Sequence, residues 1–99
     1  SLGWAQYRQG QYETAVVTLE AAVEKEPGNA EINDHLGDAY WQVGRQREAQ
    51  WQWTRVLTLD PDAERRAEIE RKLVEGLTEP TLTPGAAPAP AEAIVVGGG

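Results

Sequence analysis

The sequence predicts an all-α, right-handed helical repeat, chiefly because a set of small and chain-bending residues recurs with a fixed period of 34 residues. The residues Leu2, Gly3, Ala5, Gly10, Ala15 and Pro27 return as Leu36, Gly37, Ala39, Gly44, Ala49 and Pro61. Small residues that allow helices to approach closely, followed by residues that turn the chain, recur in this way in helix-turn-helix solenoids. In addition, the apolar residues follow helical rather than alternating spacing. Such a stack of helix pairs usually works by presenting a surface.

The first helix pair is predicted over residues 2–9 and 12–25. Gly10 ends the first helix, since glycine readily adopts the left-handed conformation found after a helix C-terminus. The second helix carries one apolar stripe at helical spacing, formed by Ala15, Val16, Leu19, Ala22 and Val23. Pro27 and Gly28 stop this helix because proline disfavours helix in the residue before it, and Asn29 can cap the next one.

The same pattern then repeats over residues 30–43 and 46–59, with Gly44 between the helices and Pro61 after them. The inward-facing residues are Ile32, Leu36, Ala39, Tyr40 and Val43, then Ala49, Trp53, Val56 and Leu57. A fifth helix is predicted over residues 63–77, with an apolar stripe of Ile69, Leu73, Val74 and Leu77. Its other face is highly charged, as a terminal cap requires, and we expect Glu68 and Lys72 to form a pair there.

The composition changes after this helix, so we expect a domain over residues 1–77 and a Pro/Ala/Gly-rich, extended tail over residues 78–99. Within the tail, Ala93-Ile94-Val95-Val96 is apolar and β-branched. Two interpretations stay open for this segment, namely a terminus without fixed structure and a tethered peptide that docks into a helix groove.

These residues resemble the tetratricopeptide repeat (TPR) family. The family's small-residue signature falls on Leu2-Gly3 and Leu36-Gly37. Its helix-ending glycine falls on Gly10 and Gly44, and its close-packing alanine on Ala15 and Ala49. Its bulky residue falls on Leu19 and Trp53, and its closing proline on Pro27 and Pro61. The resemblance implies two repeats, over residues 1–29 and 30–63, and a capping helix, as the C-terminal repeats of a longer bacterial protein. Asn33 departs from the family, which has a large aromatic residue there, and Gln46 stands where the first repeat has Tyr12.

In the family, the first helix of each repeat lines a concave groove. The groove-facing positions correspond here to Trp4, Tyr7, Arg8, Glu31, Asp34, His35, Asp38, Trp41 and Gln42, to which the capping helix adds Arg65, Glu68, Ile69 and Lys72. Carboxylates among aromatic rings suit a peptide that carries Lys or Arg and some apolar side chains. With Asp34 and Asp38 at these positions, the clamp that the chaperone-binding branch of the family uses for a peptide carboxylate is not expected.

The aromatic residues have a second interpretation, which is simple core filling. We expect Trp53 and Tyr40 to lie in the core, whereas Trp41 and Tyr7 could serve the core or the groove. Trp51 should face away from the groove, either as a partly covered surface ring or as a second contact patch.

Several other functions are disfavoured. A net charge of -7 argues against nucleic acid and anionic membrane surfaces, and the sequence has no apolar run long enough to insert into a membrane. The lack of cysteine removes disulfides and thiolate metal sites, and the only serine is Ser1. Glu31, His35 and Asp38 share one helix face, but three ligands from one straight helix favour a polar groove wall over a metal site. We therefore expect no enzyme activity, no metal and no cofactor, and localisation stays open.

The sequence thus predicts a protein-interaction scaffold that binds a peptide or partner helix in a concave groove. On this hypothesis, replacing Trp41 and Asp38 weakens binding with little change in stability. The first repeat lacks its first turn, which should leave apolar surface uncovered, so self-association is also expected. Two alternatives remain: an assembly module that homo-oligomerises through this N-terminal edge or through the tail, and a regulatory or docking appendage of a larger enzyme.

Overall fold

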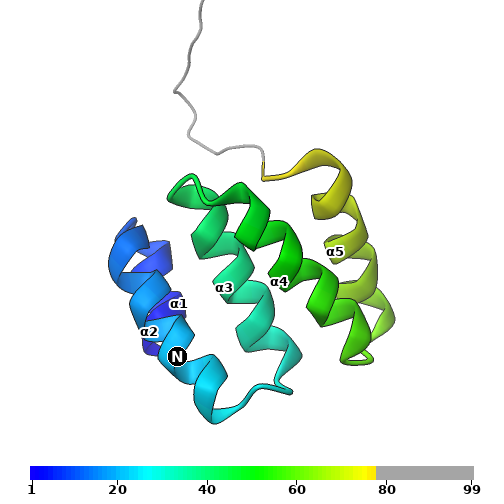
Figure 1. The fold of residues 1–99 in the computed structure, drawn as a ribbon, viewed down its shortest axis with the longest axis horizontal. Helices are drawn as coiled ribbons and strands as arrows, with labels where there is room; N and C mark the ends of the chain where they lie inside the picture. The colour runs from blue at the N-terminus through cyan, green and yellow to red at the C-terminus, as the bar shows by residue number, and fades with distance from the viewer. Residues whose placement is uncertain (78–99) are drawn as a thin grey trace, which may run out of the picture.

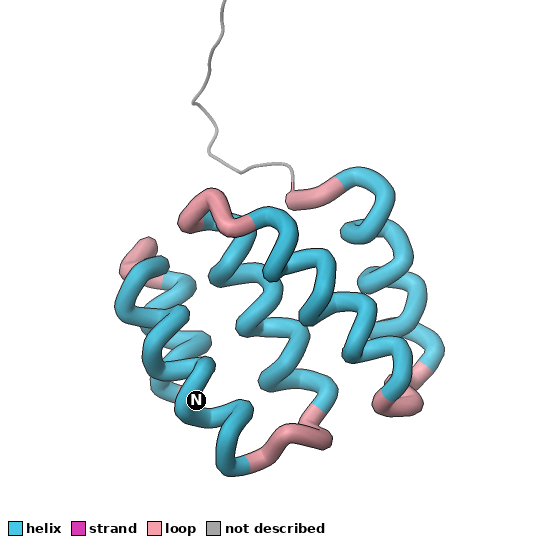
Figure 2. Tube along the Cα trace, viewed as in Figure 1, coloured by secondary structure: helices cyan, strands magenta, loops and turns pink. Residues whose placement is uncertain are grey.

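The computed structural model describes residues 1–77, which form five helices joined by short loops (Figure 1). The helices are α1 (Leu2–Arg8), α2 (Tyr12–Lys25), α3 (Ala30–Gln42), α4 (Gln46–Thr58) and α5 (Ala63–Glu75). Within the described residues there is no strand (Figure 2), and the all-α prediction is confirmed. Four of the predicted helices run one or two residues past the observed ends. The expectations for the tail, including Ile94-Val95-Val96, lie outside the described residues.

Each helix packs against the next along the chain, and α1 also contacts α3. This order of contacts is the one that a linear stack of helix pairs produces, since each unit touches only its neighbours. The stack is elongated, with extents of 46 × 26 × 21 Å. None of the helices in the described part of the chain is long and apolar enough to cross a bilayer.

Two glycines one period apart set how closely the helices of each pair approach. A Cβ atom at Gly3 would lie 2.6 Å from Leu19 Cγ, and one at Gly37 would lie 2.5 Å from Trp53 Nε1. Both distances are shorter than carbon and its neighbours tolerate, so only glycine allows this packing. The small-residue signature of the sequence therefore marks the contact between the two helices of each repeat.

The turns also follow from local sequence. Gly10 and Gly44 have φ angles of 81° and 86°, the left-handed conformation predicted for them. The side chain of Asn29 accepts a hydrogen bond from the backbone N–H of Ile32 and so caps α3, as predicted. Asp62 caps α5 in the same way through the N–H of Arg65.

One core runs through all the helix pairs. Its buried apolar residues are Ala15, Val16, Leu19, Leu36, Ala39, Tyr40, Ala49, Trp53, Val56 and Ile69. The core placement predicted for Trp53 and Tyr40 is confirmed. The prediction for Val74 is wrong, because this side chain is 85% exposed. It follows Ile69 by five positions, about 140° around the helix, and so points away from the face on which Ile69 and Leu73 meet the core.

Candidate functional site

Three rings from α1 and α3 lie face to face at the N-terminal half of the stack. The Trp4 ring is centred 4.9 Å from the Tyr7 ring and 3.9 Å from the His35 ring, with interplanar angles of 10° and 11°. All three side chains are half-buried. Gln42 Nε2 donates a hydrogen bond to the Tyr7 hydroxyl at 3.2 Å, which ties α3 to the end of α1. We call Trp4, Tyr7 and His35 the aromatic stack.

The rings of the aromatic stack are uncharged at neutral pH. Burial raises the pKa of Tyr7 to about 12, so its phenol keeps its proton. Burial also lowers the pKa of His35 and outweighs the opposing effect of the Asp34 and Glu31 carboxylates. A neutral imidazole packs on the Trp4 indole without the desolvation cost that a cation would bring.

At the C-terminal half of the helical repeat, a buried lysine of α5 joins two carboxylates of α3. Lys72 Nζ lies 2.7 Å from Asp34 Oδ1 and 2.7 Å from Asp38 Oδ1. Trp53 Nε1 donates a hydrogen bond to Asp38 Oδ1 at 3.1 Å, and Arg65 Nη1 lies 2.6 Å from Asp34 Oδ2. Lys72 is only 4% exposed, and both aspartates are buried. We call Lys72, Asp34 and Asp38 the Lys72 cluster.

The charges in the Lys72 cluster depend on one another. Burial raises the pKa of Asp38 to about 6, although Lys72 acts in the opposite direction. Burial alone would lower the pKa of Lys72, but the carboxylates of Asp38 and Asp34 outweigh this effect and the net shift is upward. Lys72 is therefore a firmly held cation whose removal would leave two carboxylates in a poorly solvated place.

A pocket of about 250 Å³ lies between α3 and the first turns of α5. Its lining residues are Asp34, Asp62, Glu64, Arg65 and Glu68. Four carboxylates and one guanidinium group line it. Arg65 and Lys72 pair with Asp34, and Arg71 pairs with Glu68, so the excess negative charge comes from Asp62 and Glu64. We call this space the acidic pocket.

Comparison with protein-family models identifies the repeat. Residues 3–44, which run from α1 through α3, match the model described as a TPR repeat. The chain thus contains a tetratricopeptide repeat. TPR repeats generally mediate interactions between proteins, and the family is typically non-enzymatic. The comparison with curated proteins gave no match.

The structure divides the predicted TPR groove residues into two groups. Trp4, Tyr7 and His35 come together in the aromatic stack, while Arg8, Glu31 and Gln42 remain exposed at the surface. Asp34 and Asp38 instead bind the protein's own Lys72 and are largely withdrawn from solvent. Ile69, which the capping helix was expected to add to the groove, lies fully in the core.

Trp41 is more a packing residue than a free groove residue. Its ring lies 5.6 Å from the Trp53 ring, and a Cβ atom at Gly76 would overlap it. The expectation that replacing Trp41 and Asp38 spares stability therefore does not suit this structure, since one side chain packs on the core and the other bonds to Lys72 and Trp53.

The predicted pairing of Glu68 with Lys72 is also wrong. Glu68 pairs with Arg71, with Oε2 and Nη2 at 2.5 Å, whereas Lys72 turns inward to the two aspartates. Lys72 gains more from two buried carboxylates than it would from one exposed glutamate, because exposed pairs contribute little.

Sequence reasoning gave no role to Asn33, which the structure buries completely. Its Nδ2 donates to the carbonyl oxygens of Pro27 and Asn29 at 3.1 and 2.8 Å, so it holds the loop before α3. The only signal was its departure from the aromatic residue that the family has there. A hydrogen-bonding amide replaces the ring's packing at this place.

The possible ligand set Glu31, His35 and Asp38 does not converge. His35 stacks on Trp4, and Asp38 is bonded to Lys72 and Trp53. Among residues 1–77, no three side chains of His, Asp or Glu are grouped as a metal ion would require.

Proposed function

We propose that this TPR protein is an interaction scaffold that binds an extended peptide or a partner helix, with the aromatic stack as its central contact. The observation that carries the proposal is the set of three half-buried rings held in register by two helices at the groove positions of the family. Rings fixed by one another lose little freedom on binding and offer their uncovered edges and outer faces to a ligand.

The charges around the stack indicate what kind of peptide fits. The acidic pocket has an excess of carboxylates, and Glu31 adds an exposed one near His35. A Lys or Arg side chain would be attracted there, while an apolar or aromatic side chain, or a cation over the ring face, suits the stack. We therefore propose a ligand with an apolar residue followed or preceded by a basic one.

A phage-displayed library of random peptides, selected on the full chain, tests this proposal. We expect selected peptides to combine basic with apolar or aromatic residues. Trp4→Ala should weaken their binding at least about tenfold, as loss of a central aromatic contact does. Glu64→Lys combined with Glu68→Lys should also weaken it, and more so at low salt.

Trp51→Ala serves as the matched control, because it also removes an indole, but this indole is exposed on α4 and lies outside the aromatic stack. Thermal unfolding of each variant separates loss of binding from loss of fold. Acidic selected peptides, or binding that Trp4→Ala leaves unchanged, would contradict the concave-site assignment.

One observation favours homo-oligomerisation through the N-terminal edge as a second candidate function. Leu2 is 65% exposed, whereas Leu36, one period later, is 2% exposed. Ala5 and Ala39 differ in the same sense, and α3 owes its cover to the neighbouring α2. A helix supplied by another molecule could cover the edge of α1 in the same way.

Size-exclusion chromatography with light scattering tests this candidate. Leu2→Asp should reduce the mass of an edge-mediated oligomer to that of the monomer. Deletion of residues 79–99 should do so only for an oligomer held by the tail. A mass unchanged by Leu2→Asp would exclude the N-terminal edge.

A further inference from the structure

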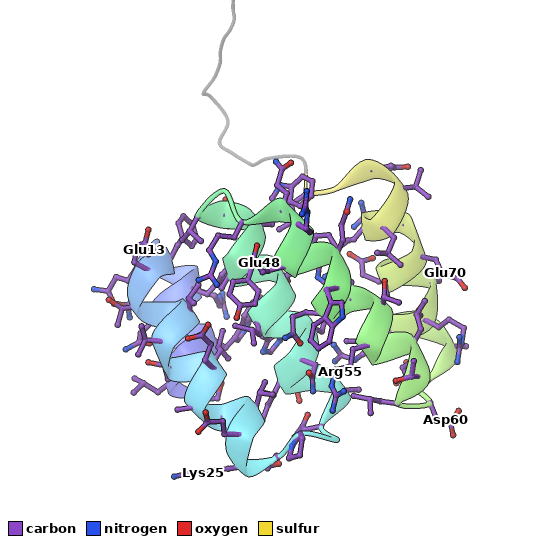
Figure 3. The ribbon with its side chains drawn as sticks, in the orientation of Figure 1. Glu13, Lys25, Glu48, Arg55, Asp60 and Glu70 are labelled. Atoms are coloured by element: carbon purple, nitrogen blue, oxygen red, sulfur yellow. The ribbon has the colours of Figure 1, made fainter. Side chains whose placement is uncertain are left out.

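An exposed indole on α4 lines a pocket that contains none of the predicted groove residues. The Trp51 side chain is 63% exposed. The pocket has a volume of about 390 Å³ and is lined by Tyr40, Arg47, Glu48, Trp51 and Gln52. Figure 3 labels Glu48, which α4 carries at the edge of this pocket. We call these five residues, with Glu20 and Arg45 beside them, the Trp51 patch.

The walls of the pocket are held in place by specific contacts. The Tyr40 hydroxyl donates a hydrogen bond to Glu20 Oε2 at 2.6 Å, and the Arg45 guanidinium carbon lies 4.5 Å from the centre of the Tyr40 ring. Arg45 Nε in turn lies 3.3 Å from Glu48 Oε2. A preformed pocket of this size can accept one large aromatic side chain without movement of the backbone.

Gln52 gives the pocket a polar feature that lacks a partner. Its side chain is only 7% exposed, and its Oε1 has no hydrogen-bond donor within the described residues. Buried acceptors are almost always paired, because an unpaired one is costly. A rotation of this amide would present the oxygen to an N–H group in the pocket, and an indole supplies one such donor.

The charges of the patch indicate the occupant. Two arginines, Arg45 and Arg47, balance two glutamates, Glu20 and Glu48, although the whole chain carries a net charge of -7. A strongly basic or acidic partner would find no complementary field here. A second copy would meet opposite charges across a two-fold axis, and it would avoid the acidic surface elsewhere that makes copies repel.

We propose that two copies of this chain associate through the Trp51 patch in a two-fold dimer, in which Trp51 of each copy enters the pocket beside Trp51 of the partner subunit. The patch is self-complementary, since it holds both the protruding ring and the pocket, and both Arg47 and Glu48. The two indoles stack in the offset manner that aromatic pairs prefer. This dimer uses none of the groove residues, so it can fail or hold independently of peptide binding.

Sedimentation of the full chain over a concentration series from about 1 µM to about 1 mM tests the dimer. Trp51→Ala should weaken dimerisation at least about tenfold, because a central tryptophan usually dominates such an interface. Val74→Ala is the matched control, since it removes an exposed apolar side chain from α5, and it should leave dimerisation unchanged. Unchanged melting temperatures would show that both variants fold.

Charge reversal tests the two-fold arrangement itself. Arg47→Glu and Glu48→Arg should each weaken the homodimer, because each places like charges opposite each other. An equimolar mixture of the two single variants should form a heterodimer, since every contact between residues 47 and 48 then joins opposite charges. A wild-type chain that stays monomeric, a dimer that Trp51→Ala leaves intact, or variants that do not pair would each overturn the proposal. Association that only Leu2→Asp removes would place the interface on the N-terminal edge instead.

Discussion

Replacing Lys72 by methionine tests whether the Lys72 cluster holds the capping helix α5 on α3. Methionine keeps an unbranched side chain of similar length but removes the ammonium group, which lies 2.7 Å from both carboxylates. Among the described residues, Asp38 Oδ1 would then retain the Trp53 N–H alone, and Asp34 would retain Arg65 alone. Removal of one partner from a buried ion pair typically costs about 3–5 kcal/mol, because the remaining charge is left poorly solvated.

That loss is large for a chain of this size. The described 77 residues should have an unfolding free energy of about 4–12 kcal/mol, from the usual value per residue. Lys72→Met should therefore lower the melting temperature by about 12 °C or more. Far-UV circular dichroism, followed during thermal and urea denaturation of the full chain at pH 7, measures both quantities.

Two further variants make the result specific. Arg71→Met removes an exposed cation one residue away, which pairs with Glu68, and should cost less than about 1 kcal/mol. Asp38→Asn added to Lys72→Met should restore at least half of the lost stability, because the amide oxygen still accepts from Trp53 and no uncompensated charge remains. If Lys72→Met cost no more than Arg71→Met, the cluster would not be what holds α5, and the reasoning would be refuted.

Three other predictions concern stability. Burial raises the pKa of Asp38 from 3.8 to about 6, so the folded state binds this proton more tightly than the unfolded state. As the pH rises from about 4 to about 6, the unfolding free energy should therefore fall by up to about 3 kcal/mol. Urea denaturation at a series of pH values measures this fall, which should be missing in Asp38→Asn; parallel profiles for the two proteins would contradict the assignment. Gly37→Ala should lower the unfolding free energy by about 1–3 kcal/mol, because its Cβ atom would meet Trp53. Gly28 has open space around it, so Gly28→Ala should change the unfolding free energy by no more than about 0.5 kcal/mol. Equal losses in thermal unfolding of the two variants would contradict the packing argument. Tyr40→Phe removes a 2.6 Å hydrogen bond to a carboxylate and should cost about 1–2 kcal/mol in urea denaturation, while a neutral effect would show that water replaces the bond.

The order and limits of the helices could be predicted because their signals are local. Gly37 must be small because its helix meets Trp53, and Gly44 must be able to take a positive φ because the chain turns there. The same two requirements recur in each repeat, so glycine recurs at these positions in the sequence. The placement of Lys72 could not be predicted in this way. Its carboxylate partners lie 34 and 38 positions away, and helical spacing offered the nearer Glu68 instead. The docking of α5 against α3 decides whether Lys72 pairs with Glu68 or with the two aspartates.

The Lys72 cluster also changes which residues of the candidate site can recognise a partner. A basic peptide that displaced Lys72 would exchange one buried ion pair for another, and it would uncover Ile69, an α5 residue that is fully buried against the core. The exchange therefore offers no net gain, and Asp34 and Asp38 act as structure rather than as recognition groups. On the proposed function, affinity would then come from surfaces that are free before binding, namely the aromatic stack and the exposed rim of the acidic pocket. Alanine at Trp41 or Asp38 would lower stability before it changed affinity, whereas alanine at Trp4 would remove a ring from the proposed binding surface.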